Sequence, residues 1–251
     1  SMAAAILVGL LELIERDAVM IRWYARLAPP QLALDAADLL ELPLGPQRQG
    51  LDIRFHDLTL EGEVPVVGVT CTERSGRPCG FLLSAAAALD MSSAARKALL
   101  EAGQGRPFVK FLANLHEAPS ASDTFGDFDL NLRFYAEPSN LHYAEWFIEN
   151  PSLSDRHFPA PQDATAPADL LRILLHRCSR MGITPIAFDM TTPEMVDHEL
   201  FACRMFVPEL VPLCVPSAPF LGHPRLARFI ASTAQSECAR RIPAWLPHPF
   251  P

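Results

Sequence analysis

Two acidic side chains and an arginine near the start of the chain could together bind a cation and a phosphate. Glu12, Glu15 and Arg16 lie in the stretch LLELIERDAV, residues 10–19. In a helix, with about 100° between residues, Glu15 and Arg16 fall within about 60° of Glu12, so the three side chains share one face. Carboxylate oxygens are suitable ligands for a divalent cation, and a guanidinium can donate two parallel hydrogen bonds to a phosphate.

The simplest interpretation of this face is a solvated one, in which Glu12 and Arg16 form an i,i+4 ion pair. Six aliphatic residues fall on the opposite side of the helix, as amphipathicity requires: Ile6, Leu7, Leu10, Leu11, Leu13 and Ile14. Four apolar residues nevertheless border the acidic face: Ala5, Val8, Val19 and Trp23. This border favours partly shielded carboxylates, and a shielded pair must bind a cation or share protons because like charges repel.

A second acidic candidate lies in the stretch ARKALLEAGQGR, residues 95–106. Glu101 and Gln104 are spaced i,i+3 and so share a face of the helix expected there. We expect that helix to run to about Gly103 or beyond, with Glu101 near its C-terminus. The helix dipole disfavours an anion at that end by about 0.3 to 1 kcal/mol, so local stability does not explain the residue. An exposed glutamate on a frayed helix end and an oxygen ligand for Mg²⁺ both stay open.

Two helices and a group of strands must position these residues. Residues 3–27 are rich in Ala, Leu, Ile, Glu and Arg and are followed by two prolines, which predicts one long helix. No good capping sequence precedes it, so we expect further chain upstream. Strands are predicted over 51–60, 64–73 and 79–87, with a turn at 75–78. The second helix starts at Ser92 or Ser93, either of which can cap it.

The second half of the chain alternates between element types. Residues 116–130 are turn-rich and predict a surface loop, and the four prolines of 150–167 predict a connection. The expected helices and strands are a helix over 141–149, a helix over 167–181, a strand over 183–191, a short helix from 193, a strand-like stretch over 202–215 and a helix over 224–240. The predicted fold class is therefore α/β (mixed α+β), with strand hairpins packed against long helices, and we expect residues 1–251 to form a single domain.

The composition narrows the classes of function. The 251 residues are 49% hydrophobic and 20% charged, which is typical of a folded soluble protein. A net charge of -8 gives no electrostatic reason to bind nucleic acid or an anionic membrane. No apolar run approaches the roughly 20 residues that a membrane helix needs. The six cysteines are scattered without CxxC spacing and no secretory leader is recognisable, so we expect reduced thiols in a cytoplasmic protein.

Other constellations of reactive residues are weaker. His176 with Cys178, and His198 with Cys203, lack the spacing of a zinc site. The sequence contains neither GxGxxG nor GxxxxGK[ST], so a nucleotide site here would be neither of the Rossmann nor of the P-loop kind. A Cys/His nucleophilic pair stays open, because such partners can lie far apart in sequence.

Five segments, in this order, resemble the YcaO family of ATP-dependent peptide-modifying enzymes. They are LLELIERDAV, ALLEAGQ at 98–104, FDMTTPE at 188–194, LGHPRL at 221–226 and the terminal PHPFP at 247–251. Residues 64–104 also resemble the strand, hairpin and helix that precede the family's second acidic helix. No single motif is specific, but their order is, and the resemblance covers nearly the whole chain. It implies a YcaO-like fold.

The resemblance implies an azoline-forming cyclodehydratase that uses ATP and Mg²⁺. In that family a Cys, Ser or Thr side chain of a ribosomal precursor peptide attacks the preceding backbone carbonyl. ATP then phosphorylates the oxyanion, and loss of phosphate leaves the ring. The resemblance assigns ATP binding to Glu12, Glu15, Arg16, Glu101 and Gln104, and metal binding to the three glutamates among them. Such chemistry mainly needs positioning and charge neutralisation around the γ-phosphate.

The end of the chain matches the azoline-forming branch of the family. Pro247, Pro249 and Pro251 reproduce its PxPxP ending, which the resemblance places at the catalytic centre. Prolines lower the entropy that is lost when a terminus is held in place. Without the resemblance, a disordered proline-rich tail is an equal alternative.

The chain also departs from the family pattern. Glu209 stands in VPEL where the family usually has glycine. The family's N-terminal portion, whose serine and paired glutamates complete the nucleotide and metal site, is missing, so we expect a domain that is incomplete at its N-terminus. The chain is then a fragment, half of a split enzyme, or a degenerate paralogue that binds peptide or acts as a scaffold; a thioamide-forming enzyme is a further alternative. The expected partners are the precursor peptide, a leader-peptide-binding protein or a complementary N-terminal YcaO portion, and a second copy in a homodimer.

Overall fold

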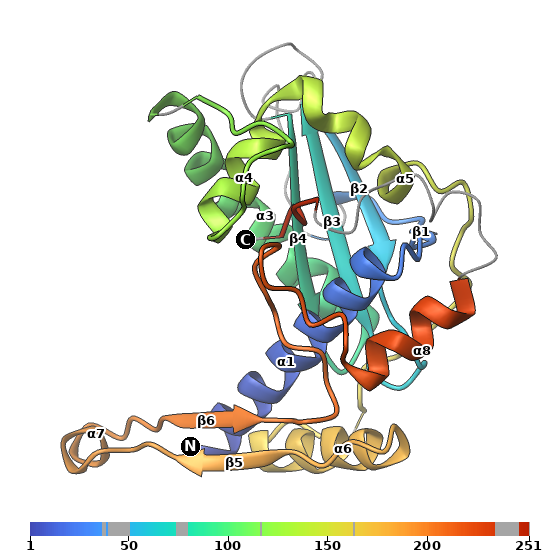
Figure 1. The fold of residues 1–251 in the computed structure, drawn as a ribbon. Helices are drawn as coiled ribbons and strands as arrows, with labels where there is room; N and C mark the ends of the chain where they lie inside the picture. Colours follow the sequence, from blue (N-terminus) through green and yellow to red (C-terminus); the bar gives the residue numbers. More distant parts are fainter. Residues whose placement is uncertain are drawn as a thin grey trace.

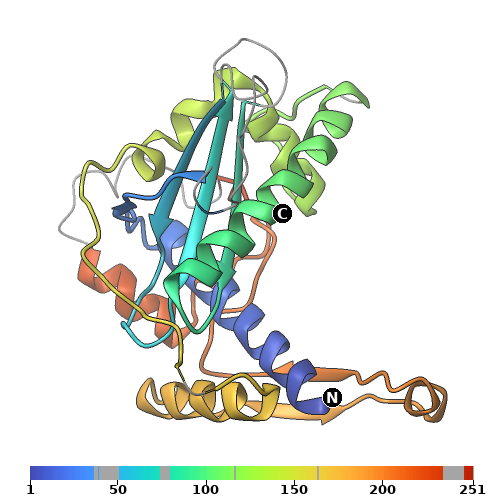
Figure 2. The same ribbon diagram turned by 180° about the vertical axis from the view of Figure 1, so that it is seen from behind.

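A four-stranded antiparallel sheet lies between two long helices (Figures 1 and 2). The computed structural model describes residues 1–36, 39, 51–73, 80–115, 117–162, 164–233 and 246–250. The strands follow one another across the sheet in chain order: β1 (Gln31–Leu32), β2 (Leu51–Asp57), β3 (Val66–Glu73) and β4 (Phe81–Ala87). In the register of the sheet, Val69 of β3 is paired with Phe55 of β2 on one side and with Ser84 of β4 on the other.

Both faces of this sheet are buried, and alternate residues of a strand pack on opposite faces. Helix α1 (Met2–Tyr24) covers the face that contains Leu83 and Ala85, and α3 (Met91–Leu115) covers the face that contains Leu82 and Ala86. Every residue of β3 and β4 is buried. Because both faces need apolar side chains, these strands read as continuous apolar runs rather than as alternating patterns.

Shorter helices and a second, small sheet surround this core. The helices are α4 (Phe128–Ala136), the 3₁₀ helix η2 (Pro138–Tyr143), α5 (Glu145–Ile148), α6 (Pro167–Arg180), α7 (Pro193–Asp197) and α8 (Pro224–Thr233). Strands β5 (Ile186–Asp189) and β6 (Cys203–Phe206) form a two-stranded arm, residues 186–206, that projects from the core with α7 at its tip (Figure 1). All four residues of β5 are exposed. The arm reaches the core through α1, since a Cβ added at Gly9 would lie 2.8 Å from Cγ of Met205.

The predicted mixed α+β fold class is confirmed, and the first helix differs from the prediction mainly at its ends. It stops at Tyr24 rather than at residue 27, because Arg26 adopts a positive φ of 55°. Its N-terminus is capped, contrary to our expectation, since the side chain of Ser1 accepts a hydrogen bond from the backbone N–H of Ala4 at 3.4 Å.

Helix α3 continues well past residue 103. It runs through Gly105 and Pro107 to Leu115. Small side chains bury it against the sheet, among them Ala98 and Ala102, and this packing outweighs the low helix propensity of glycine and proline. Glu101 is therefore in the middle of a helix, and the dipole argument that we made from a nearby helix end is wrong.

Several other boundaries needed correction. The predicted loop 116–130 ends where α4 begins, because the side chain of Asp127 accepts a hydrogen bond from the N–H of Leu130 at 2.8 Å. The helix predicted over 141–149 is a 3₁₀ helix followed by one short α-helical turn, and the strands predicted over 183–191 and 202–215 are four residues each. Cys79, Cys238 and Pro251, the turn at 75–78 and the helix predicted over 234–240 lie outside the described residues.

Among the helices that the structure describes, none is both long and apolar enough to cross a lipid bilayer.

Candidate functional site

Glu15 lies where α1, the end of β4 and α3 meet. Its side chain is only 7% exposed, although it belongs to the face that helical geometry predicts to be solvated. Oε2 of Glu15 accepts a hydrogen bond from the backbone N–H of Ala87 at 3.3 Å and lies 3.6 Å from Nζ of Lys97. The two helices cover opposite faces of the sheet, so they approach each other where β4 ends.

Lys97 joins the two predicted groups of acidic residues. Its Nζ is also 3.6 Å from Oε1 of Glu101, four residues further along α3. At the border of the site Glu12 and Arg16 form the ion pair that their spacing predicts, with both side chains partly exposed. We call these five residues, Glu12, Glu15, Arg16, Lys97 and Glu101, the carboxylate cluster. Two long helices that are far apart in sequence contribute to it.

Burial changes the acidity of the cluster. It raises the pKa of Glu15 from 4.5 to about 7; the positive charge of Lys97 opposes this rise, and the negative charges of Glu101 and Glu12 add to it. Burial also raises the pKa of Glu101, again against the effect of Lys97. Lys97 and Arg16 therefore do not fully offset the cost of burying the charged carboxylates.

The donor set fits magnesium only when other ligands complete it. Throughout the described ranges, no three or more His, Cys, Asp or Glu side chains lie close enough together to hold a metal ion. Glu15 and Glu101 nevertheless offer hard carboxylate oxygens from two separate helices. Mg²⁺ is usually bound by one or two carboxylates together with water and substrate phosphates, which is the number that this site offers. The residues present fit a nucleotide-bound Mg²⁺ better than a closed protein cage.

Gln104, the fifth residue predicted to bind ATP, lies beside the cluster. It is exposed and follows Glu101 by about one turn of α3. The structure thus brings four of the five predicted residues into one cluster and leaves the fifth at its edge.

The described part of the proline-rich tail is buried in the core. Residues 246–250 are all buried, including Pro247 and Pro249. Nε1 of Trp23 donates a hydrogen bond to the carbonyl of residue 246 at 3.4 Å, and the hydroxyl of Tyr135 donates one to the carbonyl of Pro247 at 2.8 Å. The alternative of a disordered tail is therefore wrong for these residues; Pro251 is outside the described part.

The tail and the carboxylate cluster lie at different levels of the same helix. Trp23 follows Glu15 by eight residues, which is about 12 Å along the axis of α1. The last turn of α1 contacts the tail, and its middle carries the cluster.

A buried ion pair lies next to the cluster and was not predicted from the sequence. Asp17 and Arg225 are almost inaccessible, and Nε of Arg225 is 3.0 Å from both carboxylate oxygens of Asp17. A second nitrogen of Arg225 donates to Oε1 of Glu61 at 2.8 Å, and Asp17 also accepts from the N–H of Val211 at 2.8 Å. One signal was available: in a helical projection Asp17 falls about 140° from Glu12, on the apolar side, where an acid needs a partner.

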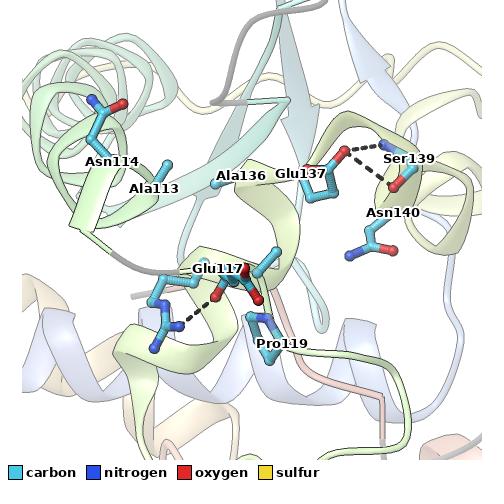
Figure 3. Close-up of a pocket in the computed structure, with 10 residues that line it drawn as sticks. Ala113, Asn114, Glu117, Pro119, Ala136, Glu137, Ser139 and Asn140 are labelled. Atoms are coloured by element: carbon cyan, nitrogen blue, oxygen red, sulfur yellow. Dashed lines mark hydrogen bonds between the residues drawn. The ribbon is translucent and has the colours of Figure 1, made fainter.

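An open hollow with a volume of 720 Å³ lies at another part of the molecule (Figure 3). It is bordered by the end of α3 at Asn114, by Glu117 and by Glu137, whose Oε1 accepts hydrogen bonds from the N–H and hydroxyl of Ser139. Asn114 lies about 20 Å from Glu101 along α3, given 1.5 Å per residue. Among the predicted site residues that the structure describes, none lines this hollow.

Glu209, which departs from the family pattern, does not strain the backbone. It lies in a turn that the N–H of Leu210 closes on the carbonyl of Val207 at 3.1 Å. Over the described ranges, positive φ angles outside glycine occur only at Arg26 and Glu199. The turn therefore does not need a glycine at position 209 for its conformation.

Comparison with known proteins identifies one family. Residues 1–211 match the family model described as YcaO cyclodehydratase, ATP- and Mg²⁺-binding. No curated protein sequence matches the chain.

Several solved structures share the fold. One is a heterocyclase in complex with substrate and cofactor (19% identity, TM-score 0.65, covering 84% of this chain and 27% of that one). The heterocyclase TruD is 20% identical, with a TM-score of 0.62 over 88% of this chain and 29% of that one. A YcaO protein from Methanopyrus kandleri bound with AMPPCP and Mg²⁺ is 22% identical, with a TM-score of 0.59 over 79% of this chain and 49% of that one. The chain spans less than half the length of each.

Proposed function

The chain belongs to the YcaO family, and we propose that it is an ATP- and Mg²⁺-dependent cyclodehydratase component that acts on a peptide. The observation that carries this proposal is the meeting of Glu15 and Glu101 around Lys97 at the buried end of the sheet. The family description, which names ATP and Mg²⁺ binding, supports the same chemistry.

The proposal gives each residue of the site a role. Glu15 and Glu101 hold Mg²⁺ together with phosphate oxygens of ATP, and Glu12 supports them from the border of the cluster. The bound Mg²⁺ supplies charge neutralisation and orientation of the phosphates. The N–H of Ala87 orients the carboxylate of Glu15. Arg16 is partly exposed at the border, where it pairs with Glu12. In the proposal its guanidinium leaves Glu12 and donates two hydrogen bonds to a phosphate of ATP.

The proposed substrate is a ribosomal precursor peptide. A Cys, Ser or Thr side chain attacks the carbonyl carbon of the preceding residue, and the oxyanion that forms takes the γ-phosphoryl group of ATP, so that ADP leaves. Loss of phosphate then gives the azoline ring, so the peptide loses one molecule of water for each ATP converted to ADP and phosphate. We assign Pro247, Pro249 and Pro251 to the catalytic end of this site; the burial of the first two supports a tail that is held in place. Gln104 is assigned to the nucleotide.

The proposed activity needs partners. Because the chain spans less than half the length of the solved structures it matches, we propose that a complementary YcaO portion completes the site and that a leader-binding protein delivers the peptide. The expected place of action is the cytoplasm.

Substitution of single carboxylates tests the proposal. Glu12→Gln, Glu15→Gln and Glu101→Gln should each abolish peptide-dependent ATP consumption when the complementary portion is supplied, together with the loss of one water mass from the peptide. Glu63→Gln is the matched control, because Glu63 is a partly buried carboxylate that pairs with Arg180 outside the cluster. Turnover at the wild-type rate in all three cluster variants would refute the assignment.

A non-catalytic peptide-binding or scaffold subunit is the second candidate. The exposed apolar side chains of the arm favour it. Calorimetry with Mg–ATP separates the two candidates, since a scaffold should bind no nucleotide. The mass of the modified peptide separates azoline formation, which loses water, from thioamide formation, which exchanges oxygen for sulfur.

A further inference from the structure

Lys97 occupies the position between the two helices of the carboxylate cluster. Its Nζ is 3.6 Å from a carboxylate oxygen of Glu15 on α1 and 3.6 Å from one of Glu101 on its own helix. Both distances are longer than the 2.7 to 3.2 Å of a normal N–H···O hydrogen bond. The ammonium is therefore shared between two anions and is not locked to either of them.

The side chain of Lys97 can leave this position without disturbing the core. It is 44% exposed, whereas Glu15 is 7% exposed. A lysine carries its charge on a flexible four-carbon stem, so the ammonium can move by several ångströms while the backbone of α3 stays in place.

The charges of the cluster make this lysine matter for metal binding. Three carboxylates face two cations, so the formal charge of the cluster is -1 when all three carboxylates are ionised and Lys97 is in place. A free divalent cation that binds between Glu15 and Glu101 meets the ammonium, and like charges at such distances repel. A cation that arrives with a nucleotide brings phosphate oxygens, which can accept the displaced ammonium.

We propose that Lys97 is the resting counter-ion of the carboxylate cluster and that a nucleotide-bound divalent cation displaces it from Glu15 and Glu101. Lys97 then acts as a selectivity residue: it disfavours free metal and favours metal that comes with phosphate. The inference rests on the proposed function only in taking this cluster as the place where the nucleotide-bound metal binds.

Titration of the full chain with Mn²⁺ in the absence of nucleotide tests the inference, with free Mn²⁺ followed by electron paramagnetic resonance. Lys97→Met removes the charge and keeps a side chain of similar length, so it should bind Mn²⁺ about tenfold more tightly than the wild type, as expected when a neighbouring unit charge is removed near the surface. Lys97→Arg keeps the charge and should bind like the wild type. Lys110→Met is the matched control, because Lys110 lies on the same helix, 42% exposed and 3.6 Å from Oε2 of Glu73.

Each outcome bears on one of the two proposals. Equal Mn²⁺ affinity for Lys97→Met and the wild type overturns the counter-ion inference, and so does a lack of measurable Mn²⁺ binding by Lys97→Met. Calorimetry of the wild type with Mg–ATP addresses the proposed function separately. Tighter Mn²⁺ binding by Lys97→Met without nucleotide binding by the wild type supports Lys97 as the resting counter-ion, but it overturns its displacement by nucleotide-bound metal and counts against the proposed function. Nucleotide binding by the wild type, together with equal Mn²⁺ affinities for Lys97→Met and the wild type, supports the proposed function and overturns the counter-ion inference.

Discussion

Replacing Glu15 by glutamine should make the fold more stable at alkaline pH. Glutamine has nearly the shape of glutamate and keeps an oxygen that can accept the hydrogen bond from the N–H of Ala87. It removes the negative charge that is buried at the junction of α1, β4 and α3. The variant therefore isolates the free-energy cost of ionising this one side chain inside the protein.

The size of the effect follows from the pKa of Glu15, which burial raises from 4.5 to about 7. A group whose pKa is raised on folding contributes stability that is fully present below pH 4.5 and is lost as the pH rises through 7. Each pKa unit corresponds to about 1.4 kcal/mol, so the ionised carboxylate costs the fold about 3 kcal/mol at pH 8. Glutamine does not incur this cost, and the free energy of unfolding gained by Glu15→Gln should be larger at pH 8 than at pH 5 by about 2 to 3 kcal/mol.

Urea unfolding of the wild type and of Glu15→Gln at pH 5 and pH 8 measures this difference directly. Glu12→Gln is the control: Glu12 is half exposed and its exchange should change the stability by less than about 0.5 kcal/mol at either pH. A gain for Glu15→Gln that is the same at both pH values would show that burial does not perturb this carboxylate. A loss of stability at pH 8 would show that the pair with Lys97 outweighs the cost of burial.

Three further changes test buried polar contacts elsewhere in the core by urea unfolding. Arg225→Met leaves the charge of Asp17 buried without its partner and should cost about 3 to 5 kcal/mol, and adding Asp17→Asn should recover part of this loss; strictly additive effects would contradict the pairing. Burial lowers the pKa of His248 from 6.5 to about 4, so the unfolded chain takes up a proton that the fold resists and stability falls as the pH drops through this range. His248→Asn should lose less stability than the wild type between pH 6.5 and pH 4, and parallel pH profiles would argue against a buried neutral imidazole. Tyr135→Phe removes the donor to the carbonyl of Pro247 and should lower the free energy of unfolding by about 1 to 3 kcal/mol. An unchanged free energy of unfolding would mean that this hydrogen bond does not stabilise the tail.

Features that depend on spacing within one helix could be predicted from the sequence. The ion pair between Glu12 and Arg16 follows from their i,i+4 separation alone. The burial of Glu15 does not, because it is set by α3 and the end of β4, which pack against α1 from elsewhere in the chain. Only the bordering apolar residues and the family resemblance pointed to it. Whether it binds metal stays a proposal.

Features that depend on distant partners could not be predicted. Asp17 pairs with Arg225, which is 208 residues further along the chain, and no local pattern can specify such a partner. The end of α3 could not be placed beyond about residue 103 for a related reason, since the helix continues through glycines and a proline and is held by packing on the sheet. The helix α4 was missed because its nine residues follow a turn-rich stretch, although Asp127 marks its start.

Helix α1 is one continuous helix that contacts four parts of the molecule. It touches the arm at Gly9, the carboxylate cluster at Glu15, the α8 arginine at Asp17 and the C-terminal tail at Trp23. Its 23 residues span about 34 Å, and an intact helix neither shortens nor stretches appreciably along its axis. A shift of α1 along its own axis would therefore change the position of Glu15 as well as the contact with the arm. One helix therefore sets the positions of the arm, of two of the proposed metal ligands and of the tail relative to one another.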